Sequence, residues 1–266
     1  MRIRVQLKAQ HLPLRLPLNY NYHLTALIYH LLSSSSRDYS TFLHDEGYQV
    51  AGKHFKLFTF SQLRFRRFRL APPEIIALEP QVNWQITSPV QQFIQHLADG
   101  LLSLGKLQIA GASLQVERVE ALAPPRFSPQ MKLTCLSPLV ASTGGFMRAG
   151  KLMAHYYRYD EPGLSEALRA NLLRKHALLH GAWPAYPDLT LKFDQDYIAR
   201  KGGKVCKLID FKGTKIKGIL APFTIEGSPE LIALGYEAGL GEKNSMGFGM
   251  VQVSDCTWDG GGGFER

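Results

Sequence analysis

Three residues in the first quarter of the chain carry side chains that metal-free cleavage of RNA could use. They are Tyr29, His44 and Lys56. In that reaction the 2′-hydroxyl of the RNA attacks the adjacent phosphorus and expels the 5′-oxygen. A histidine, with an unperturbed pKa of about 6.5, can take or give the proton near neutral pH. A lysine can stabilise the charge that builds on the phosphate, and a tyrosine can orient a group or donate a proton.

Each member of this trio also fits an ordinary structural role. Tyr29 could be an aromatic side chain on a helix flank, His44 a helix C-cap and Lys56 a surface lysine. By spacing alone these roles are the more frequent outcome, so the trio is a hypothesis that needs support from the rest of the chain.

A second candidate site is the glycine-rich segment, residues 239–249, near the end of the chain. Glycine permits positive φ and close approach of another chain, and consecutive main-chain N–H groups in such a loop can bind phosphate. The pattern lacks the Gly-Lys-Ser/Thr ending of a P-loop and is not a dinucleotide fingerprint. We therefore predict contacts to a phosphate-bearing partner. The candidate contacts are Gly239, Gly241, Lys243, Asn244, Ser245, Gly247 and Gly249.

Two basic stretches accompany these sites, and the formal net charge is +9. Basic and aromatic residues interleave over 53–69, which predicts a strand with a cationic face over an aromatic core. A second basic segment covers 200–217, where Gly202-Gly203 suggests a hairpin tip. Such residues could bind RNA or DNA phosphates, or form only a solvated basic face; a membrane surface would favour a basic amphipathic helix instead. The candidate contacts are Arg64, Arg66, Arg67, Lys201 and Lys204.

Other classes of site have weaker support. His176 and His180 lie four residues apart on a predicted helix, but a metal needs three or four ligands and no third is evident, so we predict no metal and no cofactor. No Gly-x-Ser-x-Gly nucleophile elbow occurs. The three cysteines are far apart, and no apolar run has the length of a signal peptide or membrane span. We therefore expect a cytoplasmic protein that does not enter a membrane.

These residues must be positioned by two halves with the same order of elements, namely a strand, a helix, further strands, a second helix and a last strand. Apolar periodicity indicates the elements of the first half, whose second helix should open at Ser88-Pro89 with serine as N-cap and proline at N1. Its strands are expected at 2–9, 56–70, 75–78, 83–86, 107–109 and 113–119, and its helices at 21–33, at 37–44 and after Ser88.

The second half repeats this order after the linker 123–125. Its second helix opens at Ser228-Pro229, the same start as in the first half. The expected elements are strands at 131–136, within 188–226 and at 248–253, and helices at 163–180 and 228–239. The sequence thus predicts an α+β protein of tandem ferredoxin-like (βαββαβ, RRM-like) domains at 1–123 and 126–253, with the glycine-rich loop in the second and a flexible tail at 254–266.

The chain resembles the CRISPR-associated endoribonucleases that cut precursor CRISPR RNA within its repeats, the Cas-six family. The resemblance covers residues 1–253 and is strongest at 235–251, which matches the glycine-rich motif of that family without a gap. The stretches Leu27-Ile28-Tyr29, Phe42-Leu43-His44 and Lys56-Leu57-Phe58-Thr59 match those that carry its tyrosine, histidine and lysine.

This resemblance implies a tandem ferredoxin-like fold, repeat RNA as partner, no metal, and products with a 2′,3′-cyclic phosphate and a 5′-hydroxyl. It implies catalysis by Tyr29, His44 and Lys56, although the longer loop before Lys56 leaves Lys53 as an alternative lysine. A homodimer and other CRISPR-associated effector subunits are left open as partners. The competing hypothesis is a non-cutting relative that binds CRISPR RNA within a larger ribonucleoprotein.

Overall fold

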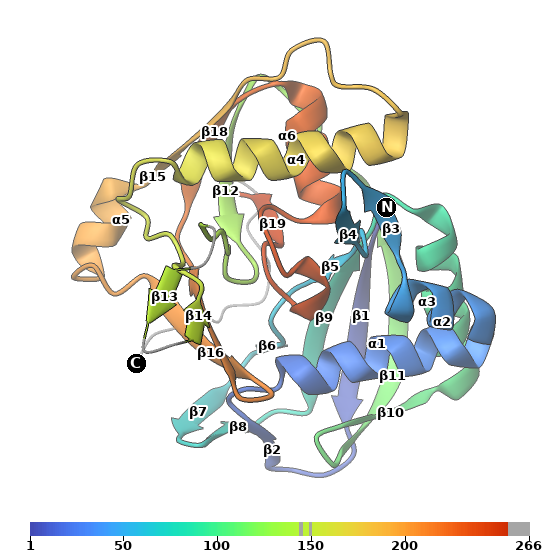
Figure 1. The fold of residues 1–266 in the computed structure, drawn as a ribbon. Helices are drawn as coiled ribbons and strands as arrows, with labels where there is room; N and C mark the ends of the chain where they lie inside the picture. Colours follow the sequence, from blue (N-terminus) through green and yellow to red (C-terminus); the bar gives the residue numbers. More distant parts are fainter. Residues whose placement is uncertain (144–145, 149–150, 255–266) are drawn as a thin grey trace.

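The computed structural model describes residues 1–143, 146–148 and 151–254, with backbone alone for 146–148 and 151–153. The predicted flexible tail, apart from Ser254, lies outside the described residues. The described chain forms two halves, each an antiparallel sheet with its own helices and apolar core (Figure 1). No helix in this part of the chain is long and apolar enough to cross a membrane.

The sheet of the first half has the strand order of a ferredoxin-like domain with one added strand at the edge. The order is β10-β11-β1-β9-β5. The short strand β6 pairs with β9 as well, at residues 82–83, whereas β5 pairs with residues 86–87 of the same strand. Without β10, the four strands β11, β1, β9 and β5 follow the 4-1-3-2 order that two βαβ-type connections produce. The strands are β1 (Arg2–Ala9), β5 (Thr59–Phe60), β6 (Arg64–Phe65), β9 (Gln81–Thr87), β10 (Lys106–Ile109) and β11 (Ala112–Leu122).

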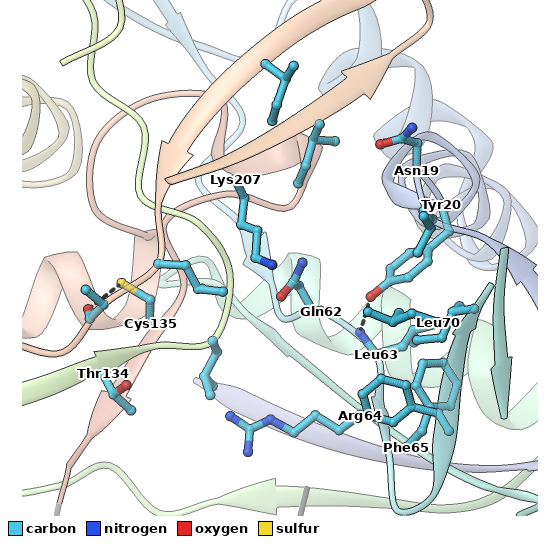
Figure 2. A pocket seen from close by; sticks show the side chains of 18 of the residues that line it. Asn19, Tyr20, Gln62, Leu63, Arg64, Phe65, Leu70, Thr134, Cys135 and Lys207 are labelled. Carbon is cyan, nitrogen blue, oxygen red and sulfur yellow. Dashed lines mark hydrogen bonds between the residues drawn. The ribbon is translucent and has the colours of Figure 1, made fainter. Parts of the chain in front are cut away.

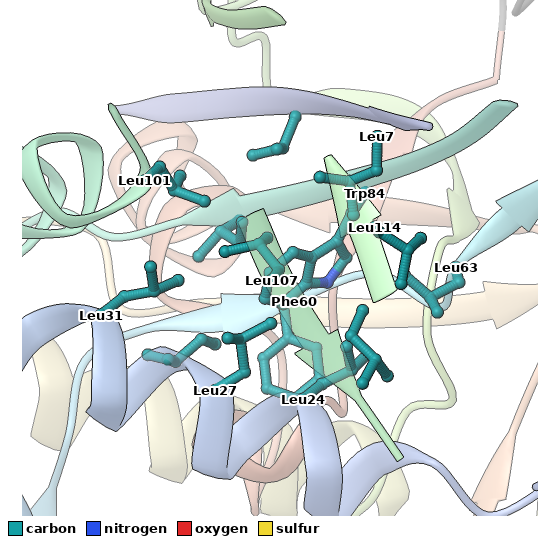
Figure 3. Packing of buried hydrophobic residues seen from close by; sticks show 14 of the residues in the cluster. Leu7, Leu24, Leu27, Leu31, Phe60, Leu63, Trp84, Leu101, Leu107 and Leu114 are labelled. Atoms are coloured by element: carbon teal, nitrogen blue, oxygen red, sulfur yellow. The ribbon is translucent and has the colours of Figure 1, made fainter. Parts of the chain in front are cut away.

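Helices α1 (Asn21–Ser35) and α3 (Gln91–Leu104) cover this sheet, and the short helix α2 (Arg37–Asp45) follows α1. The predicted apolar stripe of α1 is confirmed, because all five of its residues are buried. Figure 3 shows Leu24, Leu27 and Leu31 of this helix facing Phe60 and Trp84 from the strands. The stripe is Leu24, Leu27, Ile28, Leu31 and Leu32.

The second half repeats the arrangement with the strand order β15-β18-β12-β19, again antiparallel throughout. Its helix α6 begins as predicted, since the Ser228 hydroxyl accepts from the Leu231 N–H and Pro229 stands in the first turn. The strands are β12 (Gln130–Cys135), β15 (Leu189–Phe193), β18 (Phe223–Gly227) and β19 (Val251–Val253); the helices are α4 (Leu164–His180) and α6 (Pro229–Ala238).

Smaller elements extend from the two sheets. The hairpin of β16 and β17 belongs to the second half and reaches the start of α1, where the Asp210 N–H donates to the Asn19 side chain over 3.1 Å. The remaining elements are β2 (Leu14–Pro17), β3 (Tyr48–Val50), β4 (Lys53–Phe55), β7 (Phe68–Ala71), β8 (Glu74–Ala77), β13 (Phe146–Arg148), β14 (Lys151–Met153), α5 (Gln195–Arg200), β16 (Cys206–Phe211), β17 (Thr214–Ile219) and the 3₁₀ turn η1 (Asn244–Met246).

The predicted opening of the first half's second helix at Ser88 is wrong by two residues. Helix α3 begins at Gln91, with Val90 in the cap position. The Ser88 hydroxyl instead donates to the Leu57 main-chain oxygen over 2.7 Å and accepts from the Val90 N–H. Leu57 has φ of +52°, an unusual conformation for a branched side chain. Ser88 therefore holds the chain just after Lys56.

Two other predictions about strands are corrected. The stretch 56–70 is not one strand: the turn at Leu57 and further breaks divide it into β5, β6 and part of β7. Gly202-Gly203 is not a hairpin tip but ends α5, where the N–H groups of both glycines bond helix carbonyls. The hairpin turns ten residues later, at Lys212-Gly213, where both residues have positive φ.

Candidate functional site

The structure brings Tyr29, His44 and Lys56 together at one place on the first half. The rings of Tyr29 and His44 meet edge to face with centroids 5.2 Å apart. The Lys56 Nζ donates to the main-chain oxygen of His44 over 2.8 Å. Tyr29 and Lys56 are 27 positions apart in the sequence. In the structure their side chains and that of His44 nevertheless form one cluster of a phenol, an imidazole and an ammonium group.

Local sequence explains how three different elements reach this point. Ser36 caps α2 by accepting from the Tyr39 N–H, so the chain turns sharply between α1 and α2. The Ser40 hydroxyl then donates to the Tyr29 main-chain oxygen over 3.1 Å and ties α2 to α1. Gly47, with φ of +65°, lets the Lys56 side chain pass, because a Cβ there would lie 2.9 Å from the Lys56 Cδ.

Burial shifts the pKa of two members of the trio. It raises the pKa of Tyr29 to about 12, so the phenol is protonated at neutral pH and acts as a hydrogen-bond donor rather than a base. Burial lowers the pKa of Lys56 from its usual value, and the nearby Asp45 carboxylate raises it in part. Lys56 is only half-buried, so its ammonium group is accessible from solvent.

Asp45 also contacts the histidine of the trio. Its carboxylate lies 2.7 Å from the Nδ1 atom of His44, and both side chains are largely exposed. A carboxylate at this nitrogen favours the tautomer with the proton on Nδ1, which leaves Nε2 as the atom that can take a proton. Asp45 was not among the predicted site residues, although its position directly after the histidine is visible in the sequence.

Lys53, the alternative lysine, is exposed on β4, where it pairs with Val50 in the β3–β4 hairpin. The structure therefore places Lys56 rather than Lys53 on the backbone of His44.

The glycine-rich segment lies where the two halves meet. Its main-chain oxygens at Met246 and Gly247 accept from the Asn21 side chain, and that of Ser245 accepts from the Thr25 hydroxyl, both residues of α1. The Phe248 oxygen accepts from the Thr59 hydroxyl of β5 over 2.8 Å. The segment thus fastens the second half to the helix that carries Tyr29.

The glycines are required by this packing. Gly249 has φ of +76°, and a Cβ on it would overlap the Leu240 main-chain oxygen. A Cβ on Gly241 would overlap the Val140 oxygen, and one on Gly247 would overlap the Phe60 ring. The conformation and the close contacts together exclude larger residues.

The predicted cradle of free N–H groups is corrected in part, because five N–H groups of the segment bond protein carbonyls, including that of Met246, which donates to the Lys243 oxygen. Those of Leu240 and Glu242 donate to Gly249 and Val140, and those of Gly247 and Gly249 donate to Asn244 and Pro138.

The prediction that the Asn244 side chain contacts RNA is also corrected. This side chain is buried, and its amide bonds the Leu240 and Phe248 oxygens within the segment. Lys243 and Ser245 are half-buried and remain predicted contacts.

Residues from both predicted basic stretches meet at a cleft between the halves. The cleft has a volume of about 780 Å³ and is lined by Arg64 of β6 and by Lys201, which directly follows α5. Lys207 of β16, which was not among the predicted contacts, also lines the cleft, and its side chain lies beside Gln62 (Figure 2). Cationic and amide side chains around an apolar floor form a surface that suits a phosphate backbone with unstacked bases.

The other predicted cationic contacts lie outside that cleft. Arg66 and Arg67 are exposed in the turn after β6, each with its Nε atom 3.9 Å from a Glu79 carboxylate oxygen. Lys204 is exposed in the turn after α5.

The helical histidine pair is a tilted ring contact in which His176 is buried and His180 is exposed. The rings of His176 and His180 lie 4.4 Å apart, and the His176 Nδ1 lies 2.8 Å from the Ala182 oxygen. Across residues 1–143, 146–148 and 151–254, no group of three or more His, Cys, Asp or Glu side chains could hold a metal ion.

Comparison with known proteins gives similarity along nearly the whole chain. The family model of the CRISPR-associated protein Cas6, C-terminal, matches residues 122–253, and the Cas6 N-terminal model matches residues 15–120. The chain is 29% identical over 253 residues to the CRISPR-associated endoribonuclease Cas6 1 of Methanocaldococcus jannaschii. The matched region covers 94% of this chain and 92% of that protein.

Two solved structures share the fold. One, described as a RAMP protein binding different RNA substrates, has a TM-score of 0.81 at 25% identity and covers 95% of this chain and 99% of its own. The other, the product of a Cas6-related gene from Pyrococcus furiosus, has a TM-score of 0.83 at 24% identity and covers 97% and 99%. The predicted tandem ferredoxin-like fold is confirmed by these likenesses.

Proposed function

The chain belongs to the Cas6 family, and from that premise we propose that it is an endoribonuclease that cuts precursor CRISPR RNA within its repeats. The observation that carries the proposal is the meeting of Tyr29, His44 and Lys56 in space. A protein that only binds RNA has no need of an imidazole, a protonated phenol and an ammonium group in one cluster.

The proposed reaction is attack of the RNA 2′-hydroxyl on the adjacent phosphorus. His44 acts as general acid and base: the neutral imidazole takes the hydroxyl proton, and the protonated imidazole returns a proton to the departing 5′-oxygen. Lys56 stabilises the charge on the phosphate oxygens, and Tyr29 donates a hydrogen bond. The bond broken is between phosphorus and the 5′-oxygen, so the products carry a 2′,3′-cyclic phosphate and a 5′-hydroxyl.

The geometry also supports a path for the RNA. In Figure 1 the β16 hairpin lies on one side of the red glycine-rich segment, and α2 with β3 and β4 lies on the other. We propose that single-stranded RNA contacts Arg64 and Lys201 in the cleft, passes Lys243 and Ser245, and reaches His44. A homodimer and other effector subunits remain predictions.

The test is cleavage of the host's own repeat RNA in excess EDTA with both product ends mapped. The expected result is undiminished cutting, a 2′,3′-cyclic phosphate on one fragment and a 5′-hydroxyl on the other. A 5′-phosphate end, or loss of cutting in EDTA that added metal restores, would contradict the proposed mechanism.

A second function is supported by the neighbour described as a RAMP protein binding different RNA substrates. In that case the chain would bind CRISPR RNA without cutting it. Tight binding of repeat RNA with no cleavage by the unmodified protein would favour this function over the first.

A further inference from the structure

Lys175 of α4 is a buried lysine that neither the catalytic trio nor the cleft explains. It is 1% exposed and ranks among the largest fully buried side chains of the described chain. It follows Leu168 and Leu172 at helical spacing, on the stripe of α4 that faces the core. A methionine or leucine would suit such a position better, because burying an ammonium group costs several kcal/mol unless it is bonded.

All three hydrogen bonds of Lys175 go to the glycine-rich segment. Its Nζ donates to the Gly239 oxygen over 2.7 Å, to the Gly241 oxygen over 3.1 Å and to the Asn244 Oδ1 over 2.7 Å. An ammonium group has three N–H donors and no acceptor, so these three oxygens use its full capacity. Two of the acceptors are main-chain atoms of glycines with positive φ, so the lysine bonds the backbone shape itself.

Asn244 carries this contact across the segment. Its Oδ1 accepts from Lys175, which fixes the orientation of the amide, and its Nδ2 donates to the Leu240 oxygen over 3.1 Å and to the Phe248 oxygen over 3.0 Å. Lysine and asparagine together therefore bond four carbonyls between residues 239 and 248. They enclose the turn that presents Lys243 and Ser245.

The same turn contacts the helix of the catalytic trio. The Asn21 and Thr25 side chains donate to oxygens of residues 245–247, and Thr25 lies one helical turn before Tyr29. Glu242 is the charged group that acts most on Lys175, but its carboxylate bonds the Ser142 hydroxyl over 2.8 Å. The direct partners of the lysine are thus all neutral oxygens of the segment.

We propose that Lys175 is a positioning residue that clamps the glycine-rich segment from the core of the second half, and that this clamp sets the affinity for RNA. The effect on RNA rests on the function proposed above, whereas the clamp itself does not. Lys175 touches no reacting atom, so its loss should weaken binding more than it slows the chemical step of bound RNA.

The test compares Lys175→Met with Arg174→Met, an exposed neighbour on the same helix. Amide hydrogen exchange is followed at Leu240, Glu242 and Gly249, and affinity is measured with repeat RNA blocked by a 2′-deoxy nucleotide at the cut site. Lys175→Met should speed exchange at these amides and weaken RNA binding by about 10-fold or more, in line with loss of bonds from a charged donor. The cleavage rate at saturating protein should change far less, and Arg174→Met should resemble the unmodified protein.

A folded Lys175→Met protein with unchanged exchange and unchanged RNA affinity would overturn the proposal. If this variant does not fold, Asn244→Ala tests the same clamp with the lysine in place and should show the same faster exchange and weaker binding. Unchanged exchange and affinity in Asn244→Ala would also overturn it. If the unmodified protein binds no repeat RNA, the proposed function fails, and the exchange measurements still decide on the clamp.

Discussion

The Nζ atom of Lys56 lies 2.8 Å from the main-chain oxygen of His44, across a hairpin that separates the two residues by twelve positions. The bond holds the lysine at the end of α2, on the backbone of the residue whose imidazole would move protons. It also uses one N–H on the protein, so two remain for phosphate oxygens. The lysine and the histidine can therefore act on one phosphate group without a large movement of the backbone.

Replacing Lys56 by methionine should lower the single-turnover cleavage rate by about 10² to 10³, because a donor aimed at developing charge is lost. Lys53→Met is the matched control, since Lys53 is an exposed lysine three residues earlier. Its rate should stay close to that of the unmodified protein. A large loss in Lys53→Met together with a small loss in Lys56→Met would exchange the roles of the two lysines.

Replacing Asp45 by asparagine should change the pH dependence of cleavage. The Asp45 carboxylate raises the pKa of Lys56, so its removal lowers that pKa further. Lys56 then loses its proton at a lower pH, and the alkaline fall in rate should begin at lower pH than in the unmodified protein. The measurement is the single-turnover rate from neutral to alkaline pH with background hydrolysis of RNA subtracted. An alkaline fall that stays in place or moves upward would contradict this role of the Asp45 carboxylate.

Replacing Gly249 by alanine should destabilise the glycine-rich segment and weaken RNA binding. The alanine would have to adopt φ of +76°, and its Cβ would overlap the Leu240 oxygen. Gly213→Ala is the matched control, because Gly213 has φ of +79° but no atom within 4 Å of the position that its new methyl group would take. Left-handed backbone alone costs about 1–2 kcal/mol, so both variants should melt lower, and Gly249→Ala should do so by a clearly larger amount. Equal losses of stability would show that the close packing of Gly249 matters little.

Lys175 should make stability depend on pH. Burial lowers its pKa to about 7, whereas the unfolded chain has the ordinary value of 10.5. Between these values the unfolded state binds more protons than the folded state, so the free energy of unfolding rises as pH increases through this window. Urea unfolding of the unmodified protein and of Lys175→Met should show a difference that grows in favour of lysine across this window. A difference that is flat or falls would contradict the assigned pKa.

The fold could be predicted well from sequence because its signals are local. The α1 stripe, the Ser228-Pro229 opening and the alternation of β1 are patterns that secondary structure alone produces. Ser88-Pro89 carries the same local signal as Ser228-Pro229, yet its hydroxyl bonds Leu57 from a different element. Only the tertiary structure could show that competing partner.

The sequence allowed the residues of the candidate site to be predicted, but not the buried residues that hold the glycine-rich segment in place. Tyr29, His44 and Lys56 could be named from residue type and resemblance, and the structure brings them together. Asn244 was misread because a polar residue between glycines suggests a ligand contact, whereas here its amide is used by carbonyls and by Lys175. A lysine in phase with Leu168 and Leu172 was the one visible sign of this buried network.

We propose that His44 moves protons in RNA cleavage and does not merely help to bind RNA. The most direct test measures both properties of His44→Ala with the host's repeat RNA. We expect affinity within a few-fold of the unmodified protein and a single-turnover rate reduced by about 10² to 10⁴, the usual contribution of general acid–base catalysis. Undiminished cleavage by His44→Ala would contradict it.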